Sequence, residues 1–283
     1  MKQLVWLLGL LICTQVLFAQ EEKAKLELLP KGRFFKPLYL DPLEAQMFGS
    51  IAGISQNRSV FNPQRSFLPF GIGTYKSFLR NNGKHRWEWG IEFLAITQFE
   101  FDKNDLGTGR TMIGVDYKAA SNLTYLIRDD LAIRFRLYHL SAHWGDDFVI
   151  INNISTFDSA KLYNYNQFDI TLQWEKERLR YYAGAGVIPF QNVDFDGFSM
   201  QAGLYYHIPK TNFVRYITGA DVKSFQYFDF RPQIKAAFGV ELGKKDKQTI
   251  RFLVEYFNGH QPYLTYIDPD PLQWIGLGTS FNW

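Results

Sequence analysis

The chain has 283 residues, a net charge of +3 and an aromatic fraction of 17%. The charge is too small to indicate a nucleic-acid partner. The aromatic fraction is high for a soluble domain, yet no segment after the N-terminus has the apolar length of a membrane-spanning helix. A membrane protein with this profile must be a β-barrel, because only alternate residues of each barrel strand face lipid.

The first residues predict export. A basic start precedes an apolar run from Leu4 to Phe18, and Ala19 leads into charged residues. This order is typical of a secretory signal peptide, so we expect residues 1–19 to be removed; an uncleaved anchor is the alternative. The single cysteine, Cys13, lies in this leader, which leaves the mature chain without a disulfide, a thiol nucleophile or a thiolate zinc site.

Residues 20–44 are expected to form a periplasmic lead-in, because three prolines discourage regular structure there. From residue 45 to 283 the sequence alternates between apolar and polar residues with a period of two, most clearly in Phe230–Leu242 and Phe198–Ile208. We predict twelve strands, while ten or fourteen stay open because the first two are weakly patterned. The predicted strands are 45–55, 69–79, 84–98, 110–127, 130–143, 162–175, 178–188, 197–208, 214–225, 230–243, 248–258 and 271–283.

The connections alternate between tight turns and long loops, with a short loop after the ninth strand as the exception. Short turns on one side and long loops on the other are typical of outer-membrane barrels, in which the short side is periplasmic. We therefore predict an all-β, antiparallel up-and-down transmembrane barrel in the outer membrane of a Gram-negative bacterium. A soluble β-sandwich would also alternate, but its strands would not carry aromatic residues at both ends of an apolar face.

The last strand ends on Trp283, with Ile275, Leu277 and Phe281 on the same face. This ending resembles the C-terminal signal by which outer-membrane barrels are handed to their insertion machinery. That machinery and the outer-membrane lipids are the expected partners, and nucleic acid is not. The sequence leaves the oligomeric state open, a homodimer included.

Candidate chemistry lies on the strand at 130–143. Its outward face is apolar as far as Leu137 and continues toward the long loops with His139, Ser141 and His143. Polar groups facing lipid are costly and need a reason. The next strand brings Asn164 and Asn166 alongside. Since a serine nucleophile needs a base, and the base an orienting group, we predict Ser141 as nucleophile, His139 as base and Asn166 as orienter. His143 completes the predicted site.

The pattern His139-Leu-Ser141 resembles outer-membrane phospholipase A, a twelve-stranded barrel with a Ser-His-Asn triad. It also resembles the lipid A deacylase barrels, which use H-x-S with a glutamate. The resemblance implies a serine lipid esterase, although Ala142 stands where these families have asparagine. Calcium, which the phospholipase family uses, would have Asp146 and Asp147 as candidate ligands; a solvated acidic loop is the alternative.

A second resemblance rests on Pro37-Leu-Tyr-Leu-Asp-Pro42 together with His139-Leu-Ser-Ala-His-Trp-Gly-Asp-Asp147. These segments resemble a bacterial outer-membrane barrel family, domain of unknown function 1207, which implies no activity.

The alternative to catalysis is a non-enzymatic barrel, either a small-solute pore or a structural or adhesion protein. In that case His139, Ser141 and His143 are polar residues at the membrane interface without a chemical role. Mixed charges on the inward faces favour a packed, ion-paired lumen over an open pore. The inward charges are Asp116, Lys118, Arg134, Arg136, Asp169, Arg180, Asp221, Arg231 and Glu255.

Overall fold

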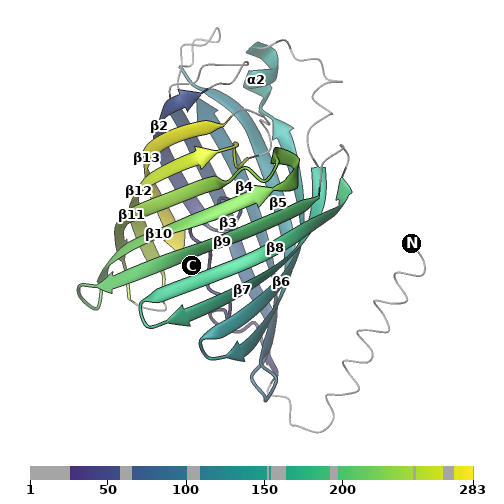
Figure 1. Ribbon diagram of the computed structural model, residues 1–283, viewed down its shortest axis with the longest axis vertical. Coiled ribbons are helices and arrows are strands. Elements are labelled where there is room, and N and C mark those ends of the chain that lie inside the picture. The colour runs from purple at the N-terminus through teal and green to yellow at the C-terminus, as the bar shows by residue number, and fades with distance from the viewer. Residues whose placement is uncertain are drawn as a thin grey trace.

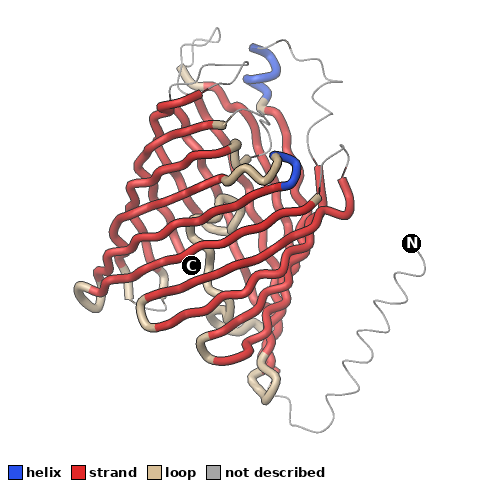
Figure 2. Tube along the Cα trace, viewed as in Figure 1, coloured by secondary structure: helices blue, strands red, loops and turns tan. Residues whose placement is uncertain are grey.

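Long antiparallel strands form a closed barrel in the computed structural model (Figures 1 and 2). The structure describes residues 26–57, 66–100, 109–151, 153, 164–191, 197–244, 247–263 and 271–282. The barrel strands are β2 (Met47–Asn57), β3 (Ser66–Asn81), β4 (Trp87–Glu100), β5 (Thr111–Arg128), β6 (Leu131–Trp144), β7 (Asn164–Lys176), β8 (Leu179–Gln191), β9 (Phe198–Pro209), β10 (Val214–Phe225), β11 (Gln233–Leu242), β12 (Thr249–Gly259) and β13 (Leu272–Asn282). Each pairs with its sequence neighbours, and β13 pairs with β2 to close the barrel.

The predicted fold class is confirmed, and each of the twelve predicted strands overlaps one of β2 to β13. Three short elements were not predicted: strand β1 (Leu26–Leu28), helix α2 (Asp146–Ile151) and the 3-10 turn η2 (Gln226–Phe228). No helix within the described ranges is long and apolar enough to span a membrane. The predicted signal peptide and Trp283 lie outside the described residues.

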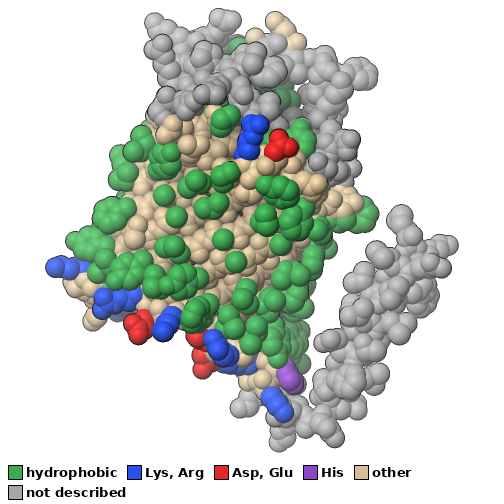
Figure 3. Space-filling model, viewed as in Figure 1, with side chains coloured by type: hydrophobic (Ala, Val, Ile, Leu, Met, Phe, Trp, Pro, Cys, Tyr) green, Lys and Arg blue, Asp and Glu red, His purple; other side chains and the backbone are tan. Residues whose placement is uncertain are grey.

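The barrel has an apolar outer surface and a polar interior. Phe238, Phe252 and Leu277 are 51–68% exposed, whereas Arg136, Arg251 and other charged side chains on the inner faces are buried. Figure 3 shows apolar side chains across the middle of the wall, with most of the charged ones in view at the lower end. This distribution is the one that a lipid environment requires.

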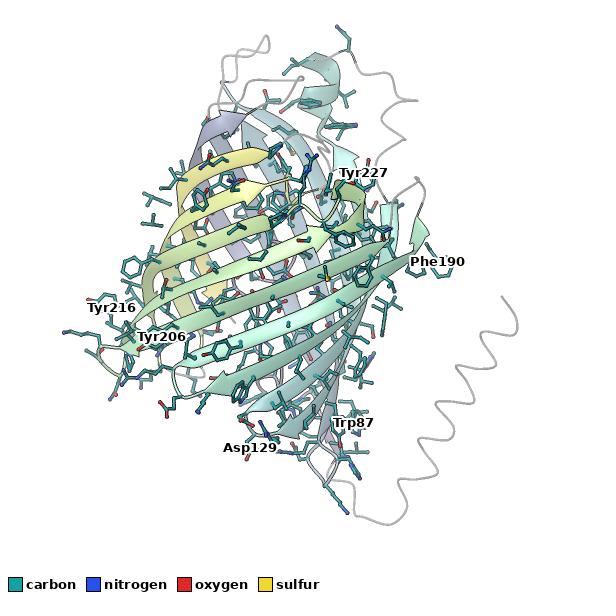
Figure 4. All side chains as sticks on the ribbon, viewed as in Figure 1. Trp87, Asp129, Phe190, Tyr206, Tyr216 and Tyr227 are labelled. Carbon is teal, nitrogen blue, oxygen red and sulfur yellow. The ribbon has the colours of Figure 1, made fainter. Side chains whose placement is uncertain are left out.

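The two ends of the barrel differ. We call the lower end in Figure 1, where tight turns join the strands, the short-turn end, and the upper end, which carries α2, the long-loop end. Among the labelled side chains of Figure 4, Trp87, Tyr206 and Tyr216 lie toward the short-turn end, and Tyr227 lies toward the other. Aromatic residues near both ends are typical of membrane–water interfaces.

Residues 34–46, which we call the plug segment, lie inside the barrel. Leu38 and Leu40 are at most 2% exposed. The backbone N–H of Leu40 donates to the Tyr205 hydroxyl at 2.7 Å, and a guanidinium nitrogen of Arg180 donates to the Pro37 carbonyl at 3.1 Å. Strands that are distant from the plug segment in sequence therefore hold it through its backbone, as well as through its apolar side chains.

Two carboxylates of the plug segment are paired with lumenal cations. Glu44 accepts from Arg134 at 3.1 Å, and Asp41 lies 3.6 Å from the ammonium of Lys223. Burial alone would raise the pKa of Asp41, but the charges of Lys223, Arg136 and Lys118 outweigh it and hold that pKa well below its usual range. Asp41 is therefore a charged group in the lumen at neutral pH.

These contacts correct the expectation for residues 20–44. We predicted a periplasmic lead-in, but residues 34–44 lie within the lumen, where Asp41 and Glu44 complement basic wall residues. Arg231 was also misplaced: it precedes β11, outside the ladder, and is exposed. The other charges predicted for the lumen are buried there.

Candidate active site

Side chains alternate along strand β6, so His139, Ser141 and His143 lie on one face and form what we call the polar patch. Arg134 and Arg136 are buried in the lumen, and the intervening side chains face outward. His139 and His143 are exposed on this outer face and Ser141 is half-buried between them, toward the long-loop end. The predicted outward orientation of all three residues is confirmed.

The register of the neighbouring strands determines what surrounds the patch. Asn166 of β7 is directly opposite His139, and Asn164 is opposite Ser141, as predicted. On the other side, Tyr117 of β5 is opposite Ser141. Since directly opposed side chains on one face of a sheet are close neighbours, three strands contribute to one cluster.

Two hydrogen-bonded pairs form within the cluster. Ser141 Oγ lies 2.9 Å from Nε2 of His143, and Nδ1 of His139 lies 3.1 Å from Oδ1 of Asn166. The second pair is the predicted base and its orienting group. The serine hydroxyl, however, is paired with His143, whereas the sequence hypothesis gave it to His139.

Tyr117 is the residue of this cluster that sequence reasoning missed. Its ring is 52% exposed and contacts the ring of His143 edge to face, with 5.6 Å between centroids. Alternation along β5 places it on the outer face. A bulge between Leu126 and Arg128 shifts the register by one residue, so counting back from the turn would have paired Ser141 with Lys118 instead. The contact limits the orientations open to the His143 ring.

The arrangement can activate a serine toward a lipid ester. A hydroxyl within 3 Å of an imidazole nitrogen is the geometry in which the imidazole can remove the proton during attack on a carbonyl. Ala142 faces the lumen and is 3% exposed, so its side chain takes no part on the outer face.

The candidate calcium ligands lie just after β6 in the chain. Asp146 and Asp147 begin α2, and a carboxylate oxygen of Asp147 accepts from the backbone N–H of Met112 at 3.3 Å. Calcium takes six to eight oxygen ligands. Across the described residues, no three His, Cys, Asp or Glu side chains are grouped closely enough to hold a metal ion.

Three solved structures of outer-membrane proteins have a similar fold. Outer membrane phospholipase A from Escherichia coli has a TM-score of 0.60 and 11% identity, covering 93% of this chain and 95% of its own. The calcium-bound dimer of the Salmonella typhi phospholipase has the same score and identity, with 86% and 93% covered. An outer membrane channel from Pseudomonas putida F1 has a TM-score of 0.52 and 11% identity, with 87% and 98% covered. At such identities the likeness shows the fold alone.

None of the curated proteins matches this sequence. The family model described as "Protein of unknown function (DUF1207)" matches residues 10–283, nearly the whole chain, as the two segments around Pro37 and His139 predicted. The chain is a β-barrel that resembles those of outer-membrane proteins, and it belongs to the DUF1207 family.

Proposed function

We propose that this barrel hydrolyses acyl esters of lipids in the outer leaflet of a Gram-negative outer membrane, with Ser141 as the nucleophile. The observation that carries the proposal is the 2.9 Å contact between Ser141 Oγ and His143 Nε2 on the lipid-facing surface. If the short turns face the periplasm, the patch lies at the level of the outer leaflet, where ester groups of lipids reach it.

The chemistry proceeds in two steps. Ser141 Oγ attacks the ester carbonyl while His143 takes the hydroxyl proton, and the histidine then protonates the leaving alcohol. Water releases the acyl chain from the serine in the second step, with His143 again accepting and returning a proton. Together the two steps consume the ester and one water molecule, and they return Ser141 and His143 to their starting states.

His139 is the second candidate base. Its Nδ1 is hydrogen-bonded to Asn166, which fixes the orientation of the ring, as an orienting residue does in a triad. The other ring nitrogen, Nε2, is not used in this bond. One of the solved phospholipase structures of the same fold is described as an active-site mutant in which an asparagine is replaced by alanine. This supports a role for Asn166, and the two bases make different predictions for mutants.

The test is hydrolysis of phospholipid and of lipid A by the purified barrel in detergent. Ser141→Ala should lower kcat by about a thousandfold or more, because the nucleophile is lost. His143→Ala should lower it by about a hundredfold or more, and His139→Ala and Asn166→Ala by less, if His143 is the base. The reverse order would identify His139 as the base.

Ser121→Ala is the matched control. Ser121 is an exposed serine on the outer face of β5. It accepts from Trp89 Nε1 at 3.0 Å and is opposite Leu137, not a histidine. Full activity is expected in this variant. Ester hydrolysis that survives Ser141→Ala would refute the proposal, as would a wild-type protein that cleaves neither class of lipid.

A further inference from the structure

A second site lies at the short-turn end, on the side of the molecule opposite the serine patch. A cavity of about 860 Å³ opens there. The lining residues come from the chain just before and within the plug segment, from β3, from the ends and turns of β7 to β12, and from β13. Such a volume is in the range of cavities that hold whole small molecules.

The lining is strongly cationic. Nine lysines and arginines line the cavity, against three glutamates. Four of the nine are ion-paired: Arg33 with Glu44, Arg80 with Glu88, Arg180 with Glu175 and Arg215 with Glu241. The basic side chains come from separate segments, including Lys31 before the plug segment, Lys76 on β3, Arg178 in the β7–β8 turn and Lys247 in the β11–β12 turn. Their convergence indicates an anionic ligand.

The cavity also opens sideways through the wall. The pairing of β2 with β3 ends at Gly71, and β1 pairs with β3 only from Leu79 onward. Residues 73–77 of β3, which lie between these two pairings, line the cavity together with Phe281 of β13. Lys76 is exposed on the outer face of β3, so the cavity reaches the lipid-facing surface.

We propose that this cavity binds an anionic phospholipid, with the phosphate among the basic side chains and the acyl chains leaving through the side opening. The apolar residues beside the opening, Ile72 and Phe281, are 54% and 38% exposed and face the hydrocarbon. A free phosphate would leave most of the volume unfilled and would make no use of the opening. The lipid enters from the leaflet at the short-turn end.

Native mass spectrometry of the detergent-solubilised full-length barrel with phosphatidylglycerol tests the site. The variant combines Lys76→Gln, Arg178→Gln and Lys247→Gln. The control combines Lys84→Gln, Lys210→Gln and Lys244→Gln, which removes equal charge from exposed residues of the same end that do not line the cavity. A basic side chain near an anionic headgroup is worth about fivefold in affinity, so the variant should bind at least about tenfold more weakly.

The control should bind phosphatidylglycerol as the wild type does, and phosphatidylethanolamine should bind wild type more weakly. Heat-modifiable migration in gels checks that all three proteins are folded. Equal retention of phosphatidylglycerol by variant and control would overturn the proposal. Displacement of the lipid by millimolar inorganic phosphate would also overturn it, because the cavity would then be a site for a soluble anion. Lipid hydrolysis is not measured, so the result is independent of the role of Ser141.

Discussion

Within the described part of the lumen, Arg136 lies near four carboxylates. Its guanidinium lies 2.7 Å from Asp169, 3.6 Å from Glu44 and from Glu92, and 3.9 Å from Asp41, and the residue is fully buried. Two of these carboxylates belong to the wall and two to the plug segment. One cation therefore joins the wall to the plug segment.

Replacing Arg136 by leucine should destabilise the barrel strongly. Four buried carboxylates would lose the cation they share, and breaking a buried pair costs about 3–5 kcal/mol. Arg128→Leu is the control, because Arg128 pairs with Asp130 at 3.0 Å on the exposed rim and such pairs contribute about 0–1 kcal/mol. Urea unfolding in lipid vesicles measures both. Equal stability of the two variants would show that the network contributes little.

At the scale of residues, the sequence predicted part of the candidate active-site cluster. Alternation and register were enough to place Ser141, the two histidines and Asn166 on one face. Which histidine contacts the serine depends on side-chain rotation and on the ring of Tyr117, and neither is encoded in a two-residue period. The hydrogen bond between Ser141 and His143 therefore could not be predicted from the sequence.

At the scale of elements, the strands follow from local pattern and the plug segment does not. Each strand carries its own apolar stripe, so the sequence alone locates it. The plug segment has no period, and its partners, among them Tyr205, Arg134 and Lys223, come from β9, β6 and β10. Pairing between residues 90 or more positions apart leaves no trace in the local sequence, and the prolines predicted only the absence of a helix or strand.

Close strand packing requires glycine at one position of β11. A Cβ atom at Gly239 would lie 1.9 Å from the carbonyl oxygen of Phe252 on β12. Gly239→Ala should therefore destabilise the barrel by about 1–3 kcal/mol through overpacking. Gly53→Ala is the control, because a Cβ there meets nothing within 4 Å. Unfolding midpoints in denaturant compare the two, and indistinguishable midpoints would contradict the prediction.

At the scale of the whole molecule, the filled lumen decides between a pore and a closed barrel. The plug segment is held by ion pairs and by backbone hydrogen bonds from several strands. Its buried apolar side chains, Phe35, Leu38 and Leu40, pack with wall residues. We infer that the wild-type barrel does not conduct ions steadily.

Planar-bilayer recordings test this inference. Wild-type protein should give no steady conductance, whereas the double variant Asp41→Asn, Glu44→Gln should give opening steps. Its plug segment would lose the pairs with Lys223 and Arg134, and the unpaired cations would repel one another. Glu27→Gln, an exposed change on β1, should remain silent. Large ohmic steps from the wild type would instead support the small-solute pore.

The position of the plug segment also restricts the order in which the parts of the protein can fold. Residues 34–46 precede β2, and the barrel closes only when β2 meets β13, at the far end of the chain. A segment surrounded by a finished wall would have to thread through it. Closure depends on the contacts of greatest sequence separation, which form late. The plug segment should therefore be seated on the open sheet first, and its carboxylates would then help to recruit β6 and β10 before the last ladder forms.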